Sequence, residues 1–148
     1  MKVSISLAKA EEIVEAALAK GHQLKFEPLT VAVLDAGGHL VALKREDRSG
    51  ILRPDIAIGK AWGALGMGFG SRELGERAVK VPHFMNALMA ASHGRFVPVP
   101  GGVLILESGA VIGAVGISGD TSDNDEICCL AGVAAAGYVG QTGFRPPE

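Results

Sequence analysis

The chain has 148 residues, of which 48% are hydrophobic and 20% charged, and its formal net charge is -2. This length suits one domain with one sizeable core, and the composition excludes an intrinsically disordered chain. The near-neutral charge and the few aromatic residues (one Trp, one Tyr and five Phe) argue against binding of nucleic acid or of a membrane surface. No apolar run reaches the ~18 residues of a membrane span, and the N-terminal stretch lacks the apolar segment of a signal peptide, so we expect a cytoplasmic protein.

The N-terminal quarter of the chain predicts a helix followed by a hairpin. Residues 6–20 have the apolar period of an amphipathic helix, with Ser6 placed as N-cap and Gly21 as C-cap. Residues 30–34 and 40–43 are typical of strands. The paired glycines of the sequence DAGGH between them favour a tight turn, so the two strands should pair antiparallel.

The middle of the chain predicts a glycine-rich helix and two shorter ones. A helix over residues 54–69 begins with a proline in its first turn and is apolar on most sides. It contains Gly59, Gly63, Gly66 and Gly68. An interior glycine costs roughly 1 kcal/mol relative to alanine, so we expect another element or another subunit to approach this helix closely. Two short helices should follow, over residues 71–79 and 82–92.

The C-terminal part predicts a second hairpin and a last helix. Residues 103–107 and 110–117 read as strands joined by a Ser-Gly turn, and a helix is expected over residues 123–138. The predicted order is helix, hairpin, helices, hairpin, helix. Hairpins give an antiparallel sheet, and helices of this length would cover its faces, so the predicted fold class is α/β in the α+β sense.

The chain shows no internal repeat, linker or low-complexity tract. We therefore expect a single domain over residues 1–148, with an ordered core at about 4–138. The last ten residues, 139–148, are expected to be loose, because they are rich in glycine, proline and polar residues.

The acidic stretch GISGDTSDNDE allows three interpretations. A calcium loop would need a glycine and a distal glutamate that this stretch lacks, and a phosphate cradle would be opposed by the local carboxylates. A helix N-terminus explains more, with Ser122 or Asp123 as N-cap and Glu126 in a capping box. Capping does not require Asp120 and Thr121, which leaves room for a polar site at the end of the preceding strand.

The histidines and cysteines form no compact metal motif. The histidines are His22, His39, His83 and His93, and no two of them have a ligand spacing. The adjacent Cys128 and Cys129 suit core packing better than a disulfide or a metal knuckle. We therefore expect no metal-ion site. Haem needs only one axial ligand and an apolar slot, so the spacing of the histidines leaves a haem site open.

The loop before the second hairpin is a candidate ligand contact. Its glycines, Gly101 and Gly102, leave backbone amides with little side-chain cover. Counting outward from the hairpin turn sets them opposite residues near Gly116, so the loop and the pair Asp120-Thr121 should share one edge of the sheet. The alternative is that both segments are simply well-packed turns.

Four stretches together resemble the GlcG/HbpS family, which is related to the C-terminal domain of PduO corrinoid proteins. They are TVAVLDAGGHLVALKRED, IAIGKAWGAL, PVPGGVLIL and GAVGISGDTSDNDE, and the resemblance covers residues 4–138. It implies a profilin-like three-layer arrangement, with a five-stranded antiparallel sheet and helices on both faces. It also implies a homo-oligomer, often an octamer, and a haem-binding protein. Members use different haem ligands, and His22 and Thr121 are candidates here by position and chemistry.

The leading hypothesis is a cytoplasmic, oligomeric binding protein for haem or a similar tetrapyrrole, accessory to a catabolic operon. Its candidate cofactor contacts are His22, Gly101, Gly102, Asp120 and Thr121. The rival is a small-molecule enzyme acting on an organic acid, with an arginine clamp and strand-end carboxylates supplied by Arg45, Asp35, Glu107 and Asp120. A third hypothesis is an assembly subunit without a ligand.

Overall fold

A computed structural model describes residues 3–143, which form one sheet covered by helices on both faces. In chain order the elements are α1 (Leu7–Gln23), β1 (Thr30–Asp35), β2 (Leu40–Arg45), α2 (Arg53–Met67), α3 (Ser71–Lys80), α4 (Pro82–Ala91), β3 (Gly102–Glu107), β4 (Ala110–Ser118), α5 (Ser122–Ala135) and β5 (Val139–Gln141). Within the described range, no helix has both the length and the apolar character needed to cross a membrane.

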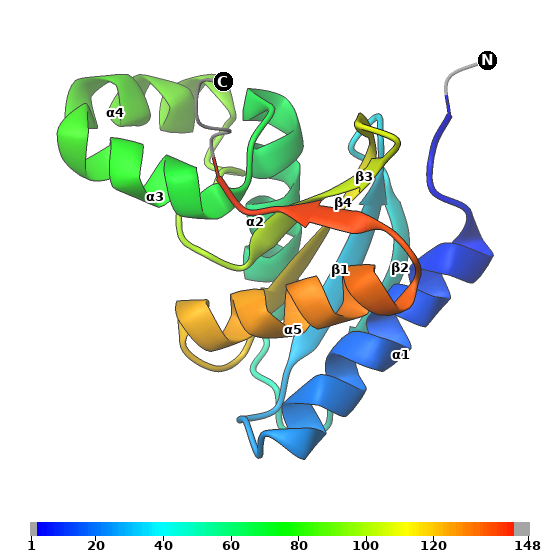
Figure 1. Cartoon of the computed structure of the whole chain (residues 1–148). Coiled ribbons are helices and arrows are strands. Elements are labelled where there is room, and N and C mark those ends of the chain that lie inside the picture. The colour runs from blue at the N-terminus through cyan, green and yellow to red at the C-terminus, as the bar shows by residue number, and fades with distance from the viewer. Residues whose placement is uncertain (1–2, 144–148) are drawn as a thin grey trace.

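The sheet has five strands in the order β2-β1-β4-β3-β5, and every neighbouring pair is antiparallel. The two hairpins predicted from the sequence therefore lie side by side, joined through β1 and β4. Figure 1 shows α1 and α5 together on one face of this sheet and α2 on the other. The predicted three-layer arrangement with a five-stranded antiparallel sheet is confirmed.

Alternate residues of the central strands enter two separate cores. On β1, Val31 and Val33 pack in the core under α1 and α5, whereas Leu34 packs in the core under α2. Side chains of a strand alternate between its two faces, so a strand buried on both sides must be apolar throughout. The sequence TVAVL meets this requirement, since all of β1 except its last residue is buried.

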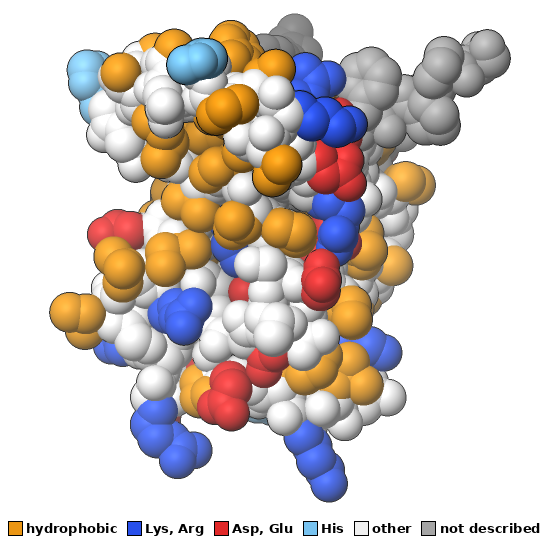
Figure 2. Space-filling view, turned by 90° about the vertical axis from the view of Figure 1, so that its left-hand side faces the viewer, with side chains coloured by type: hydrophobic (Ala, Val, Ile, Leu, Met, Phe, Trp, Pro, Cys, Tyr) orange, Lys and Arg blue, Asp and Glu red, His pale blue; other side chains and the backbone are white. Residues whose placement is uncertain are grey.

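The helices α3 and α4 form a third packing unit at one side of the molecule (Figure 1). Leu74, Met85 and Phe96 are its buried centre. Figure 2 views the molecule from this side and shows hydrophobic side chains gathered in a band below these helices. Phe84 on α4 is 47% exposed. This part of the molecule therefore presents apolar surface to its surroundings.

The largest differences from the sequence prediction lie at α1, at α5 and in the C-terminal segment. Ser6 caps α1 as expected, but the helix continues past Gly21. This glycine is buried and so closely packed that a Cβ there would lie 2.8 Å from Leu29 Cδ1. The last helix ends at Ala135 rather than near residue 138. The segment expected to be loose begins with a strand, β5, whose three residues pair with β3. The rest of that segment beyond residue 143 lies outside the described residues.

Candidate functional site

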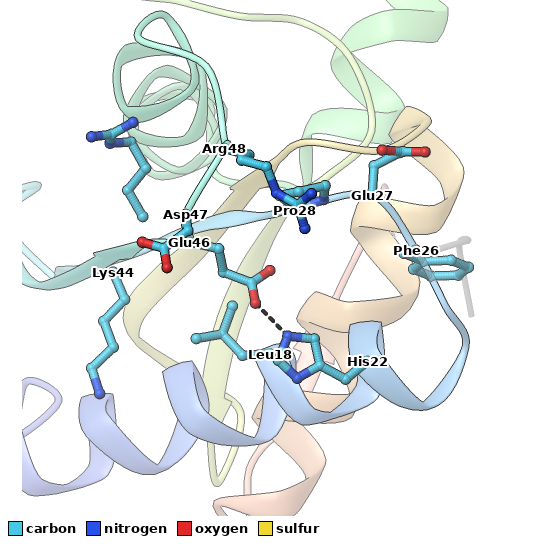
Figure 3. Close-up of a pocket in the computed structure, with 10 residues that line it drawn as sticks. Leu18, His22, Phe26, Glu27, Pro28, Lys44, Glu46, Asp47 and Arg48 are labelled. Atoms are coloured by element: carbon cyan, nitrogen blue, oxygen red, sulfur yellow. Dashed lines mark hydrogen bonds and ion pairs between the residues drawn. The ribbon is translucent and has the colours of Figure 1, made fainter.

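A groove with a volume of about 580 Å³ lies between the C-terminal end of α1 and the end of β2. Figure 3 shows how its side chains are arranged. The groove is lined by Leu18, His22, Phe26, Glu27, Pro28, Lys44, Arg45, Glu46, Asp47 and Arg48. Its volume falls within the range of about 300–1,000 Å³ that is common for small-molecule sites.

His22 and Glu46 form the central polar pair of this groove. The Nε2 atom of His22, on the last turn of α1, bonds the carboxylate of Glu46 (Figure 3). The other oxygen of that carboxylate accepts a hydrogen bond from the Leu29 backbone at 2.8 Å, and the Glu46 backbone N–H donates to Leu29 O at 3.0 Å. Glu46 is therefore held firmly, with a side chain 17% exposed, whereas the His22 side chain is 69% exposed. The imidazole is oriented by its partner but open to a ligand.

The remaining lining residues give the groove an apolar floor and a charged rim. Leu18, Phe26 and Pro28 supply apolar surface, and Arg48 lies above them in Figure 3. Lys44 also lines the groove, and its ammonium pairs with Glu15 on α1. A flat apolar molecule with acidic substituents would match such a surface, because its body can lie on the floor while its acids meet the cations.

The acidic stretch forms the start of α5, but its cap differs from the prediction. Thr121 is the N-cap, and its Oγ1 accepts a hydrogen bond from Asn124 N at 3.2 Å. The prediction of Ser122 or Asp123 as N-cap was wrong by one or two positions. Glu126 forms no capping box, because its carboxylate receives two hydrogen bonds from Arg72 on α3 at 3.0 and 3.1 Å. Burial still raises the pKa of Glu126 against the attraction of Arg72.

Asp120 connects the start of α5 to the groove. Its carboxylate accepts hydrogen bonds from Glu27 N at 2.7 Å, Thr121 N at 2.8 Å and Asn124 Nδ2 at 2.7 Å. The bond from the Glu27 backbone is the main reason that the pKa of Asp120 is lowered. Asp120 therefore holds the backbone of Glu27, which lines the same groove as His22. Direct ligand contacts of Asp120 and Thr121 stay a prediction.

Asp125, another carboxylate of the acidic stretch, is buried and pairs with Lys60 at the end of the sheet. Lys60 Nζ donates to Asp125 Oδ2 at 3.1 Å and to Ile117 O at 2.8 Å, and both side chains are at most 3% exposed. Burial raises the pKa of Asp125, and the ammonium of Lys60 opposes that rise. The carboxylates of the stretch thus divide among different partners, since Asp123 and Glu126 pair with Arg72, Asp125 with Lys60, and Asp120 with backbone N–H groups and Asn124. Among residues 3–143, no group of three or more metal-binding side chains comes together.

Gly101 and Gly102 do not offer the open backbone that was expected. The predicted register is confirmed, since Gly102 lies opposite Gly116. However, the Gly102 N–H donates to Ser71 Oγ at 2.7 Å, and both glycines are buried. A Cβ on Gly102 would lie 2.3 Å from Lys60 O, and one on Gly101 would lie 2.8 Å from Lys60 Nζ. Close packing against α2 explains both glycines, as the alternative of a well-packed turn predicted.

The residues of the rival enzyme hypothesis are divided between the two ends of the sheet. Asp35 ends β1 and Glu107 ends β3, next to the two hairpin turns. Arg45 ends β2 and Asp120 follows β4, at the opposite end, where Thr30 pairs with Arg45 and with Ser118. A strand of this length spans roughly 20 Å, so the four residues cannot all act on one substrate molecule, whereas Arg45 and Asp120 share one end of the sheet.

Sequence reasoning missed two residues that organise the site and its surroundings. Glu46 lies in the charged stretch KRED, which reads as solvated surface. Lys60 is the one charged residue in the interior of an otherwise apolar helical stretch, IAIGKAWGAL, and that isolation was the available signal of a buried, paired charge.

Comparisons with known proteins agree with this architecture. A 15.0 kDa protein of Citrobacter freundii, encoded in the dhaT-dhaS intergenic region, is 32% identical over 84% of this chain and 86% of its own length. The corrinoid adenosyltransferase PduO of the same organism is 26% identical over 90% of this chain, which corresponds to only 39% of that enzyme. The crystal structure of a PduOC–haem complex superposes with a TM-score of 0.83 at 26% identity, covering 92% of this chain and 97% of that one.

A family model matches residues 5–134, which is most of the chain. The family is described as haem-degrading, HbpS-like proteins. This match agrees with the resemblance inferred from the four sequence stretches. The relationship to the C-terminal part of PduO is also confirmed. The chain therefore belongs to the HbpS-like family.

Proposed function

We propose that this protein binds haem in the groove between α1 and β2, with His22 as the axial ligand. The observation that carries the proposal is the position of His22, whose imidazole is oriented by Glu46 beside an apolar floor. The PduOC–haem complex, which has the same fold, supports haem as the ligand. A similar tetrapyrrole would make the same demands on the floor and the rim.

The residues of the groove fit the chemistry of haem. Leu18 and Phe26 offer apolar surface to the macrocycle, and Arg48 is a cation available to the propionates, whereas Lys44 already pairs with Glu15. When bound, haem supplies an iron whose axial ligand and surroundings set its reactivity.

Glu46 has a supporting role in this proposal. A neutral imidazole that donates from Nε2 to a carboxylate keeps its lone pair on Nδ1. The Glu46 carboxylate thus fixes the tautomer and the orientation of His22, as carboxylates do for many metal-bound histidines. Because Leu29 holds Glu46 through two backbone hydrogen bonds, this orientation does not depend on the ligand.

Titration with hemin tests the proposal through the Soret band. The unmodified protein should shift the band saturably, and His22→Ala should abolish or strongly weaken the shift. Glu46→Gln should weaken binding by roughly 10-fold. His39→Ala is the matched control, because His39 is also exposed but lies in the β1–β2 turn. Absence of any Soret change with the unmodified protein would overturn haem binding. An unchanged spectrum with His22→Ala would reject His22 alone.

We further propose that the protein is a homo-oligomer larger than a dimer, with an octamer as one such assembly. Exposed apolar side chains support this, among them Ile51 at 94%, Val79 at 84% and Phe84 at 47% exposure. The glycine-rich helix supports it less than expected, because the chain itself approaches Gly59 and Gly63, through Arg95 O and Phe96. Light scattering of the purified protein is the test, and a monomer would contradict the proposal.

The cellular role that we propose is that of a cytoplasmic binding protein accessory to a catabolic operon. The relative encoded between dhaT and dhaS supports a place for this gene among neighbouring genes of an operon. Mapping the transcript that carries this gene, together with cell fractionation, tests both parts. A monocistronic transcript or a protein outside the cytoplasm would contradict them.

A further inference from the structure

Three hollows meet at Trp62, on the part of α2 that faces α4 and the segment before β3. Their volumes are about 470, 190 and 220 Å³. Trp62 lines all three, and none of them shares a lining residue with the groove of His22. This region is therefore a concave surface separate from the proposed haem site.

The hollow of 190 Å³, called here the Trp62 slot, is almost entirely apolar. It lies between α2 and α4 and is lined by Trp62, Gly63, Gly66, Met67, Leu88, Ala91, Ser92 and Phe96. Among these residues, only Ser92 and the indole N–H of Trp62 supply a polar side-chain group. A Cβ on Gly63 would lie 2.6 Å from the ring of Phe96, so that side is closed. A Cβ on Gly66 would meet nothing within 4 Å, so the space beside this glycine is open.

Arg95 provides a cation in the hollow next to this slot, and the two hollows share Trp62. Its guanidinium carbon lies 3.9 Å from the centroid of the Trp62 ring, in the neighbouring hollow of 470 Å³. Among the described residues, no hydrogen bond or ion pair is formed by this guanidinium. Stacking on Trp62 holds it in place while its N–H donors remain available, which is the arrangement that suits a carboxylate.

We propose that the Trp62 slot binds a small monocarboxylate with a single six-membered ring, such as an aromatic acid. The ring would lie in the slot against Trp62, and the carboxylate would meet Arg95. A cavity of about 150 Å³ holds benzene, so the slot accepts one ring and excludes a tetrapyrrole. Asp55 also lines the larger hollow, and its negative charge disfavours a ligand with a second carboxylate.

The protein contains one Trp, so its tryptophan fluorescence comes from Trp62 and reports on the three hollows that this residue lines. Benzoate is the probe, and benzyl alcohol is the neutral control of similar shape. Benzoate should change the emission saturably and bind at least about tenfold more tightly than benzyl alcohol, because a charged hydrogen bond is lost with the alcohol. Arg95→Gln should weaken benzoate by a similar factor and leave benzyl alcohol unchanged.

Two further variants separate slot binding from other causes. Gly66→Leu should fill the slot and prevent binding of both probes without lowering the melting temperature, because its Cβ meets no neighbour. Ala87→Leu, on an exposed position of α4, is the matched control and should bind benzoate normally. His22→Ala should also bind benzoate normally, which makes this result independent of haem binding.

Several outcomes would overturn the proposal. One is an emission that benzoate does not change, or a response that persists in Gly66→Leu. Another is equal binding of benzoate and benzyl alcohol together with no effect of Arg95→Gln. An emission that changes on dilution but not with benzoate would assign the slot to a second copy of the chain.

Discussion

Replacing Lys60 by methionine should destabilise the protein more than any exposed charge substitution. The change keeps the length and apolar stem of the side chain but removes the ammonium that faces Asp125 and Ile117 O. Asp125 then keeps one hydrogen bond, from Asp120 N at 2.9 Å, and loses its only cation. A carboxylate that is 1% exposed would be left without a compensating charge.

The expected loss is about 3–5 kcal/mol, the usual effect of removing one partner of a buried ion pair. At about 4 kcal/mol the ratio of folded to unfolded protein falls roughly a thousandfold, a large part of the 5–15 kcal/mol typical of a domain. Urea unfolding followed by circular dichroism measures this difference. Lys44→Met is the matched control, because that lysine pairs with Glu15 at the surface and should matter far less.

The pH dependence gives the variant a distinctive signature. Burial already raises the pKa of Asp125 above its unfolded value, and loss of Lys60 removes the influence that lowers it. A carboxyl whose folded pKa is raised contributes stability at low pH and loses it as pH rises through the folded pKa. The deficit of Lys60→Met relative to the unmodified protein should therefore shrink as pH falls from 7 towards the folded pKa of Asp125.

A double variant and one negative result complete the test. Lys60→Met with Asp125→Leu should recover much of the stability, because a buried ion pair can be replaced by apolar groups at little cost. A deficit below about 1 kcal/mol for Lys60→Met that is constant with pH would refute a buried, charged pair.

Three other substitutions or treatments give clear expectations. Gly102→Ala should lower the free energy of unfolding by about 3 kcal/mol, because its Cβ would clash with the Lys60 backbone. Gly66→Ala should instead raise the free energy of unfolding by about 0.5–1 kcal/mol. If thermal unfolding shows both variants stabilised or both destabilised, this reasoning is contradicted. Thr121→Ala should cost about 1 kcal/mol in chemical denaturation through loss of the α5 cap, and Thr121→Ser should restore most of it, so equal losses would argue against capping. Burial raises the pKa of Cys128 to about 11, so a thiol reagent at pH 8 should label the native protein far more slowly than the unfolded one; rapid labelling of native protein would disprove this protection.

The sequence predicted the sheet well where the pattern was local. The run TVAVL and the glycine pair after it specify a buried strand and a turn without help from the rest of the chain. Counting from the Ser108-Gly109 turn gave the register of Gly102 against Gly116 correctly, because a hairpin register follows from its turn. The residue pattern did not predict β5, because three residues are too few to show a periodicity. This strand is defined only by its pairing with β3.

The sequence predicted the site only in part, because its geometry depends on distant contacts. His22 was identified by residue type and position, and the structure places it in the groove between α1 and β2. Glu46 could not be singled out, because only its contacts with Leu29 and His22 separate it from its charged neighbours. The expected role of Gly101 and Gly102 rested on local flexibility, whereas the structure shows that the close approach of the Lys60 backbone requires Gly102 and that Gly101 has a φ of 112°, a conformation that favours glycine.

The packing of α1 on α5 has a consequence for how the chain folds during synthesis. Ile13, Val14 and Ala17 of α1 are covered by Cys128, Cys129 and Val133 of α5, and these helices lie about 100 residues apart in the chain. At about 5–20 residues per second, the ribosome needs roughly 5–20 seconds to make that intervening length. During this time the apolar face of α1 has the β1–β2 hairpin beside it but lacks the cover that α5 provides. Nascent chains stalled before residue 122 should therefore be sensitive to protease within α1 and should recruit chaperones, and both properties should disappear once α5 has left the ribosome.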